Sequence, residues 1–122
     1  MFYEFQPSDI NIIINHREVK FRPHIHKQIE IIYVFELGQH INIAGKNYEI
    51  KEGEAAIIFP NTVHTYYRNE WRPTEQIFAI VSQELFHGLF PDLSRFSTDC
   101  PIITDIEDSV KLAFKELAQC TD

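Results

Sequence analysis

Apolar residues alternate with polar ones in short runs over the first eighty residues, a period typical of β-strands. Turn-forming residues, such as those of Gly45-Lys46-Asn47 and Pro60-Asn61, separate the runs. The connections are too short for crossover helices, so the pattern predicts an antiparallel sandwich or barrel. The predicted strands are Ile10–Ile14, Val19–His26, Glu30–Leu37, His40–Ala44, Tyr48–Ile50, Ala55–Phe59, Thr62–Tyr67 and Gln76–Val81.

The spacing of the apolar residues becomes helical after Ser82. A short helix is predicted over residues 82–90, with Ser82 as its N-cap. A longer helix is predicted from Asp105 to Gln119, where Thr104 and Glu107 have the spacing of a capping box. Its apolar stripe suits a helix packed on its own sheet and equally a dimer helix, and the stripe alone does not separate the two. The predicted centre of the dimer surface is Val110, Phe114 and Leu117.

Composition and charge limit the function classes. The chain has 122 residues, 44% hydrophobic and 24% charged, which predicts one soluble domain. Its net charge of -7 and scattered basic residues argue against direct binding to nucleic acid. No stretch resembles a signal peptide or a membrane span, and Cys100 and Cys120 lack metal-type or redox-type spacing. A cytoplasmic location without membrane contact is therefore expected.

Three residues of metal-binding types, His24, His26 and Glu30, lie within seven positions. Residues two apart on a strand point the same way, so the two imidazoles can converge. Four residues further on, a straight strand would carry Glu30 about 13 Å from His26, too far for a shared ligand. If the three act together, the chain must bend at Lys27-Gln28.

His64, in the segment PNTVH, is the fourth candidate. Three imidazoles and a carboxylate suit a divalent ion such as Zn, Ni, Mn or Fe. Three interpretations stay open: a catalytic metal centre, a metal held without turnover, or a hydrogen-bonding floor for a ligand or an internally satisfied cluster. The last is favoured, and a catalytic centre is the least favoured because no second motif supplies an acid, base or clamp. No catalytic residue is therefore predicted, and no cofactor is required.

Two further side chains are predicted to contact a ligand. Tyr66 shares the parity of His64, and a ring with a polar tip suits stacking on a sugar, as Tyr67 and Trp71 also would. Arg22 shares the parity of His24 and suits a carboxylate or phosphate. The alternatives are a core aromatic and a surface arginine. The predicted ligand-binding set is His24, His26, Glu30, His64, Tyr66 and Arg22.

The motif HIHKQIE, followed by Gly38, Gly53 and PNTVH, resembles the two motifs of the cupin superfamily, a small antiparallel β-barrel. The run over residues 21–67 is more similar to the N-terminal effector-sensing and dimerisation domain of AraC-family transcriptional regulators. Two glycines of the enzymatic pattern are missing: Glu18 lies near the place of one, and Asn61-Thr62 replace the other. Both departures favour a sensor over an enzyme.

The resemblance implies a jelly-roll-like, cupin-type barrel followed by one short and one longer α-helix. Residues 1–104 would form the barrel with an N-terminal arm and the short helix, and residues 105–122 would begin a dimerisation or linker helix. It implies a homodimer that binds a small-molecule effector and acts on DNA only through a helix-turn-helix domain outside this chain. The alternatives are a metal-dependent cupin dioxygenase, isomerase or lyase, and a non-catalytic small-molecule-binding cupin.

Overall fold

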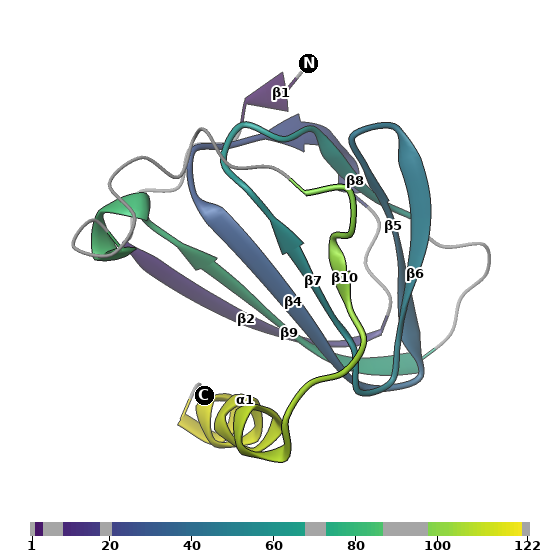
Figure 1. Cartoon of the computed structure of the whole chain (residues 1–122), viewed down its shortest axis with the longest axis vertical. Helices are drawn as coiled ribbons and strands as arrows, with labels where there is room; N and C mark the ends of the chain where they lie inside the picture. The colour runs from purple at the N-terminus through teal and green to yellow at the C-terminus, as the bar shows by residue number, and fades with distance from the viewer. Residues whose placement is uncertain (1, 4–8, 18–20, 68–72, 87–97, 121–122) are drawn as a thin grey trace.

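The computed structural model describes residues 2–3, 9–17, 21–67, 73–86 and 98–120. Figure 1 shows two layers of strands with one helix at the C-terminal end of the chain. The elements in chain order are β1 (Phe2–Tyr3), β2 (Ile10–Arg17), β3 (Phe21–Ile25), β4 (Ile29–Glu36), β5 (Gly38–Ile43), β6 (Lys46–Lys51), β7 (Ala55–Ile58), β8 (His64–Tyr67), β9 (Pro73–Val81), the 3-10 helix η1 (Gln83–Phe86), β10 (Ile102–Ile103) and α1 (Asp108–Cys120).

The strands form two five-stranded sheets. The first has the order β1-β3-β8-β5-β6 and the second the order β10-β7-β4-β9-β2. Among the described strands, every pair is antiparallel except β1 with β3. The predicted fold class, a cupin-type antiparallel barrel with a C-terminal helix, is confirmed.

The core lies between the two sheets. Ile32 and Val34 of β4 share the parity of Glu30, point inward from the second sheet and are fully buried. Tyr66 of β8 meets Phe78 of β9 from the opposite layer, with ring centroids 5.2 Å apart. The buried residues of this cluster are Ile32, Val34, Ile41, Ile43, Ile50, Ala56, Ile58, Tyr66 and Phe78.

Positive backbone φ angles fix two turns that shape the barrel. Ala44 and Gly45, at 51° and 89°, connect β5 to β6 as a two-residue hairpin in which Ile43 pairs with Lys46. The turn therefore lies one residue earlier than Gly45-Lys46-Asn47. Asn61, at 61°, occupies the predicted Pro60-Asn61 turn, and asparagine tolerates this left-handed region better than most residues.

Helix α1 begins at Asp108, so the predicted start at Asp105 and the capping box are wrong. Ile102 pairs with Ala56 of β7, which keeps the chain extended two residues before Thr104. The carbonyl of Glu107 accepts hydrogen bonds from the amides of Val110 and Lys111 and so opens the helix. A short edge strand, which the sequence pattern did not predict, displaced the start of the helix.

The predicted short helix is in part a 3-10 turn, η1. Its start is as expected, because the Ser82 hydroxyl accepts a hydrogen bond from the Glu84 amide at 3.3 Å. Residues 87–90 of the prediction lie outside the described part of the chain, as do Val19 and Lys20 of a predicted strand.

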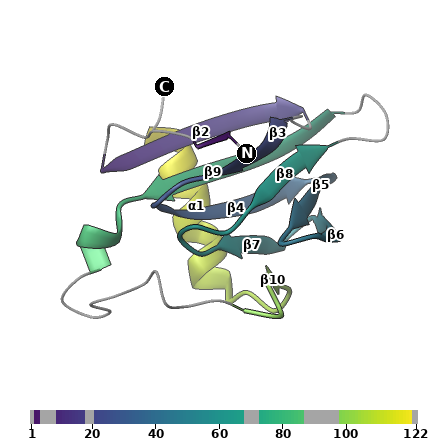
Figure 2. The same cartoon turned by 90° about the horizontal axis from the view of Figure 1, so that it is seen from above.

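Helix α1 crosses the outer face of the second sheet (Figures 1 and 2). The ring of Phe114 stacks on Tyr33 of β4 at 4.7 Å with an interplanar angle of 2°. Leu117 packs into the same cluster, whereas Val110 is 44% exposed. Two of the three side chains predicted for a dimer surface thus contact their own sheet, which was the alternative interpretation of the stripe.

Candidate functional site

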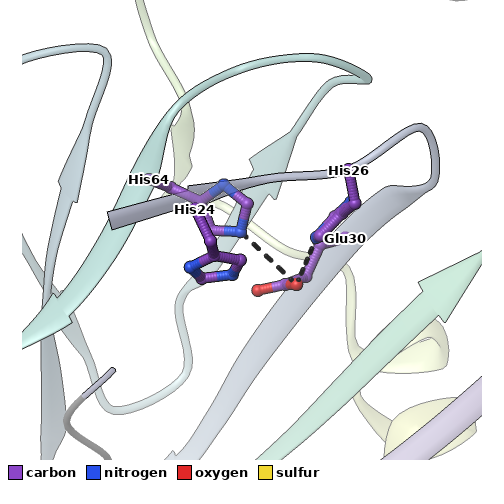
Figure 3. Close-up of side chains that lie close together, drawn as sticks. All are labelled: His24, His26, Glu30 and His64. Carbon is purple, nitrogen blue, oxygen red and sulfur yellow. Dashed lines mark hydrogen bonds and ion pairs between the residues drawn. The ribbon is translucent and has the colours of Figure 1, made fainter. Parts of the chain in front are cut away.

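The bend between β3 and β4 brings the first three candidate residues together. β3 ends at Ile25 and β4 begins at Ile29, so the chain turns at Lys27 and Gln28 as the spacing required. His26 follows the last residue of β3, and Glu30 is the second residue of β4. Figure 3 shows the imidazole of His26 directed at the Glu30 carboxylate.

His64 reaches the same place through strand pairing. It opens β8 directly opposite His24 of β3, and their ring centroids are 4.0 Å apart. The loop before it is fixed to the bend, because the Asn61 amide donates a hydrogen bond to the carbonyl of His26 at 2.8 Å. Two segments far apart in the sequence are therefore held as one unit.

The four side chains form a closed, buried cluster. His24, His26, Glu30 and His64 are each 1–2% exposed, and one potential ligand atom of each lies within 4.8 Å of the others. Glu30 belongs to the second sheet, whereas His24 and His64 belong to the first. The cluster therefore links the two layers of the barrel.

Backbone carbonyls fix the orientation of all three imidazoles. Nδ1 of His24 donates to the carbonyl of Arg22 at 2.9 Å, and Nδ1 of His64 to that of Thr62 at 2.9 Å. Nδ1 of His26 donates to the carbonyl of Gln28 at 3.1 Å. A carbonyl can only accept, so Nδ1 carries a hydrogen, and Nε2 has a lone pair when the ring is neutral and a second proton when the ring is charged. This is the arrangement that second-shell partners give to metal-binding histidines.

The cluster holds Glu30 as a carboxylate. Burial alone would raise its pKa, but the hydrogen bond from His26, the close approach of His64 and the charges of the two rings lower the pKa to about 2. Nε2 of His26 lies 3.0 Å and Nε2 of His64 3.6 Å from the same oxygen, Glu30 Oε1. Nitrogen lone pairs facing a carboxylate need a proton or another cation between them.

Around this cluster, three buried polar atoms have no hydrogen-bond partner among the described residues: Glu30 Oε2, His64 Nε2 and the hydroxyl of Tyr66. The Tyr66 ring lies 5.9 Å from His64 and 6.2 Å from His24 between ring centroids, so all three atoms belong to one region. Unsatisfied buried polar groups cost free energy, so three in one place indicate a missing partner.

Arg22 does not share the face of His24, contrary to its parity. The register of β3 against β8 shifts between Phe21 and His24, because Phe21 pairs with Tyr66 across an extra residue. Arg22 is exposed, and Phe21 instead places its ring 4.7 Å from His24. The sequence signal for the bulge was Pro23, since proline within a strand is found at edges and bulges. Trp71 lies outside the described residues.

A family model for the AraC-like ligand binding domain matches residues 10–90, which is more than half of the chain. The chain belongs to this family. As a member of this family, the domain is a ligand-sensing regulatory domain. No curated protein matches the sequence.

Solved structures agree with the AraC-like fold at low sequence identity. ToxT from Vibrio cholerae O395, crystallised with (E)-4-(8-methylnaphthalen-1-yl)but-3-enoic acid, has a TM-score of 0.54 at 11% identity over 94% of this chain. The Cnp3 cupin domain of Schizosaccharomyces pombe has a TM-score of 0.53 at 10% identity, covering 75% of this chain and 68% of that one. This chain spans 49% of the ToxT chain. None of the described helices has the length and apolar character needed to cross a membrane.

The donor set of this AraC-like domain fits a divalent metal ion. Two ligands bound at about 2.0–2.2 Å lie roughly 3.0–3.6 Å apart in octahedral or tetrahedral geometry. The separations of 3.0 and 3.6 Å between Glu30 Oε1 and the two imidazole nitrogens are of this size. The three imidazoles and one carboxylate could therefore hold such an ion, with their ligand atoms already within 4.8 Å of one another.

Proposed function

We propose that this domain senses a small molecule inside its barrel, at a site formed by His24, His26, Glu30, His64 and Tyr66. The observation that carries the proposal is the group of three unpartnered buried atoms on Glu30, His64 and Tyr66. A bound partner would recover the free energy that their burial costs: an ion could take up the atoms of His64 and Glu30, and a ligand could hydrogen-bond the Tyr66 hydroxyl. Arg22 is not included, because it is exposed beyond the bulge in β3.

We propose that the three histidines and Glu30 hold a divalent ion, Zn, Ni, Mn or Fe, as part of this site. Support comes from the Nδ1 hydrogen bonds, which aim three Nε2 lone pairs at one carboxylate. When bound, the ion would supply a fixed positive charge and coordination positions for oxygen atoms of the ligand. Tyr66 would add a hydrogen bond and so contribute to selectivity.

The domain is proposed to act as a sensor and not as an enzyme. Its family is one of ligand binding, and the effector would shift a balance between two arrangements of the domain. In the full regulator, two copies would pass this change to DNA-binding domains outside this chain. A metal-dependent cupin enzyme remains the second candidate, because the same four side chains favour metal binding.

A thermal-shift screen of sugars and small organic acids tests the sensing site, with and without the four divalent ions. The acids are included because ToxT was crystallised with a carboxylic acid. A ligand at 100 times its dissociation constant stabilises by about 2.7 kcal/mol, which corresponds to an upward shift on the order of 10 °C. We expect a hit whose shift is reduced in Tyr66→Phe and lost in His64→Ala.

The matched control is Tyr67→Phe, which removes a hydroxyl from the neighbouring position of β8. Tyr67 points away from Tyr66 along the strand, and its ring lies 5.4 Å from His40. A hit whose shift is the same in the wild type, Tyr66→Phe and His64→Ala would place the ligand elsewhere and contradict the proposal.

A further inference from the structure

Strand β2 lies at one edge of the second sheet. The sheet has the order β10-β7-β4-β9-β2, and Figure 2 shows β2 as its outermost strand beside β9. Within the described part of the chain, no strand pairs with the other edge of β2. A strand of eight residues with an open edge is a template for pairing with another chain.

The backbone groups at this edge can be identified from the ladder. The Ser82 amide donates to the carbonyl of Asp9, one residue beyond the pair Ile10–Val81. Because hydrogen-bonded and non-hydrogen-bonded positions alternate in an antiparallel ladder, odd-numbered residues of β2 bond to β9. The amides and carbonyls of the even-numbered residues therefore face the open edge: Ile10, Ile12, Ile14 and His16.

The exposed edge carries none of the usual protection against pairing between Ile10 and Asn15; a charged residue, Arg17, and a register irregularity occur only at the end of the strand. From Ile10 to Asn15 the strand reads INIIIN, with no charged residue and no proline. Ile10 is 55% and Ile13 is 40% exposed. Natural edge strands are normally blunted by lysine, proline or a bulge, so this one resembles half of an interface.

We propose that a second copy of this chain pairs with β2, antiparallel, about a two-fold axis at Ile13. The sequence is symmetric about that residue: Ile12 and Ile14, then Asn11 and Asn15, lie at equal distances from it. Further out, the symmetric positions carry opposite charges, Asp9 and Arg17. An isologous contact requires this kind of self-complementarity.

The proposed register agrees with the backbone pattern. Pairing about Ile13 sets Ile12 opposite Ile14 and Ile10 opposite His16, so every partner of an even-numbered residue is also even-numbered. These are the residues whose amides and carbonyls face the open edge, and two-fold pairing joins them to one another. Ile13 then faces its own copy as a non-hydrogen-bonded pair, with Cα atoms about 4.5 Å apart.

Charge at position 13 tests the contact. In Ile13→Lys or Ile13→Glu, two like charges would lie directly opposite each other, which is destabilising. Sedimentation analysis of the wild type should give a dimer, and each variant alone should give a monomer. An equimolar mixture of the two variants should give a dimer again, because the paired charges are then opposite. This recovery would also show that both variants are folded.

A disulfide tests the register independently. In a background with Cys100→Ser and Cys120→Ser, Ile13→Cys should form a cross-linked dimer on oxidation, because about 4.5 Å between Cα atoms suits a disulfide. The matched control Ile10→Cys should not cross-link. Its two copies would lie six residues apart along the pairing, roughly 20 Å.

The β2 contact would form the homodimer of the proposed function, but the observations that support this contact come from β2 alone. Leu112→Lys alters the most exposed apolar side chain of α1, at 55%. A dimer that resists Ile13→Lys but dissociates in Leu112→Lys would overturn the β2 contact and leave the homodimer standing. A wild type that is monomeric at all concentrations would overturn both. Equal cross-linking of Ile10→Cys and Ile13→Cys would also overturn the register.

Discussion

Each imidazole of the cluster is held by a carbonyl two residues away along the chain. The partners of His24 and His64 precede them, and the partner of His26 follows it. The rings are therefore positioned by local backbone, before any ligand is present. Their Nε2 atoms converge on Glu30, the one acidic group in the cluster. Preorganisation of this kind lowers the entropic cost of binding.

The charge of Glu30 predicts how stability depends on pH. Its pKa is lowered from 4.5 to about 2 in the folded protein, where burial opposes and the two histidines favour the charged form. The stabilisation is therefore complete above about pH 4.5 and is lost as the pH falls towards 2. Urea midpoints of chelator-treated protein should fall over this window, and the fall should be smaller in Glu30→Gln.

Glu36→Gln is the control, since Glu36 lies on the same strand and is exposed. Its urea midpoints should follow those of the wild type. If Glu30→Gln lost stability with decreasing pH as steeply as the wild type, Glu30 would not be the group whose ionisation is linked to folding.

At single positions, predictions from the length of chain between two residues were more accurate than predictions from strand parity. The span from His26 to Glu30 demanded a bend, and the bend lies at Lys27 and Gln28. The prediction that Arg22 shares the face of His24 was wrong. It assumed an uninterrupted strand, and the bulge before His24 interrupts the pairing. The Nδ1 hydrogen bonds could not be predicted, since they depend on the local backbone conformation around each histidine.

Helix α1 is attached to the barrel by a small apolar contact on its inner side. Phe114 stacks on Tyr33, and Leu117 and Ala118 pack beside it against the same sheet. The opposite side exposes Val110 and Leu112. One side of the helix therefore packs on its own domain, and the other side exposes apolar residues.

Phe114→Ala tests this attachment. Full truncation of a core phenylalanine costs about 3–5 kcal/mol, and Phe114 is only half-buried, so we expect a loss of about 1–3 kcal/mol in the free energy of unfolding. Leu112→Ala, at an exposed position of the same helix, should change it by less than about 0.5 kcal/mol. Urea unfolding measures both. Equal effects would mean that Phe114 does not attach the helix.

Element types were more predictable than element boundaries. The eight predicted strands correspond to β2–β9, since alternation and turn residues mark each of them. β10 was not predicted, because its two residues, Ile102 and Ile103, are too few to show an alternating pattern. Its pairing with β7 is also a long-range contact that the local sequence does not reveal. The spacing of Thr104 and Glu107 favours a helix start locally, but the pairing of β10 with β7 moved the start of the helix to Asp108.

Across the whole molecule, the cluster joins the two layers of the barrel. Glu30 lies in the second sheet, with His24 and His64 in the first. A ligand or ion bound between them would stabilise both sheets together, because it would bind only when the layers are closed. This offers a physical route from an occupied site to the rest of the domain, including α1 on the outer face of the second sheet.

Metal binding by the four clustered side chains is tested most directly by a calorimetric titration of chelator-stripped protein with Zn, Ni, Mn or Fe ions. We predict one ion bound per chain by the wild type and at least about tenfold weaker binding by His26→Ala and Glu30→Gln, since loss of even an outer-shell partner costs about 10–100-fold. His16→Ala, which alters a histidine outside the cluster, should bind like the wild type. Failure of the wild type to bind any of these ions, or equal binding by all the variants, would contradict a metal site at this cluster.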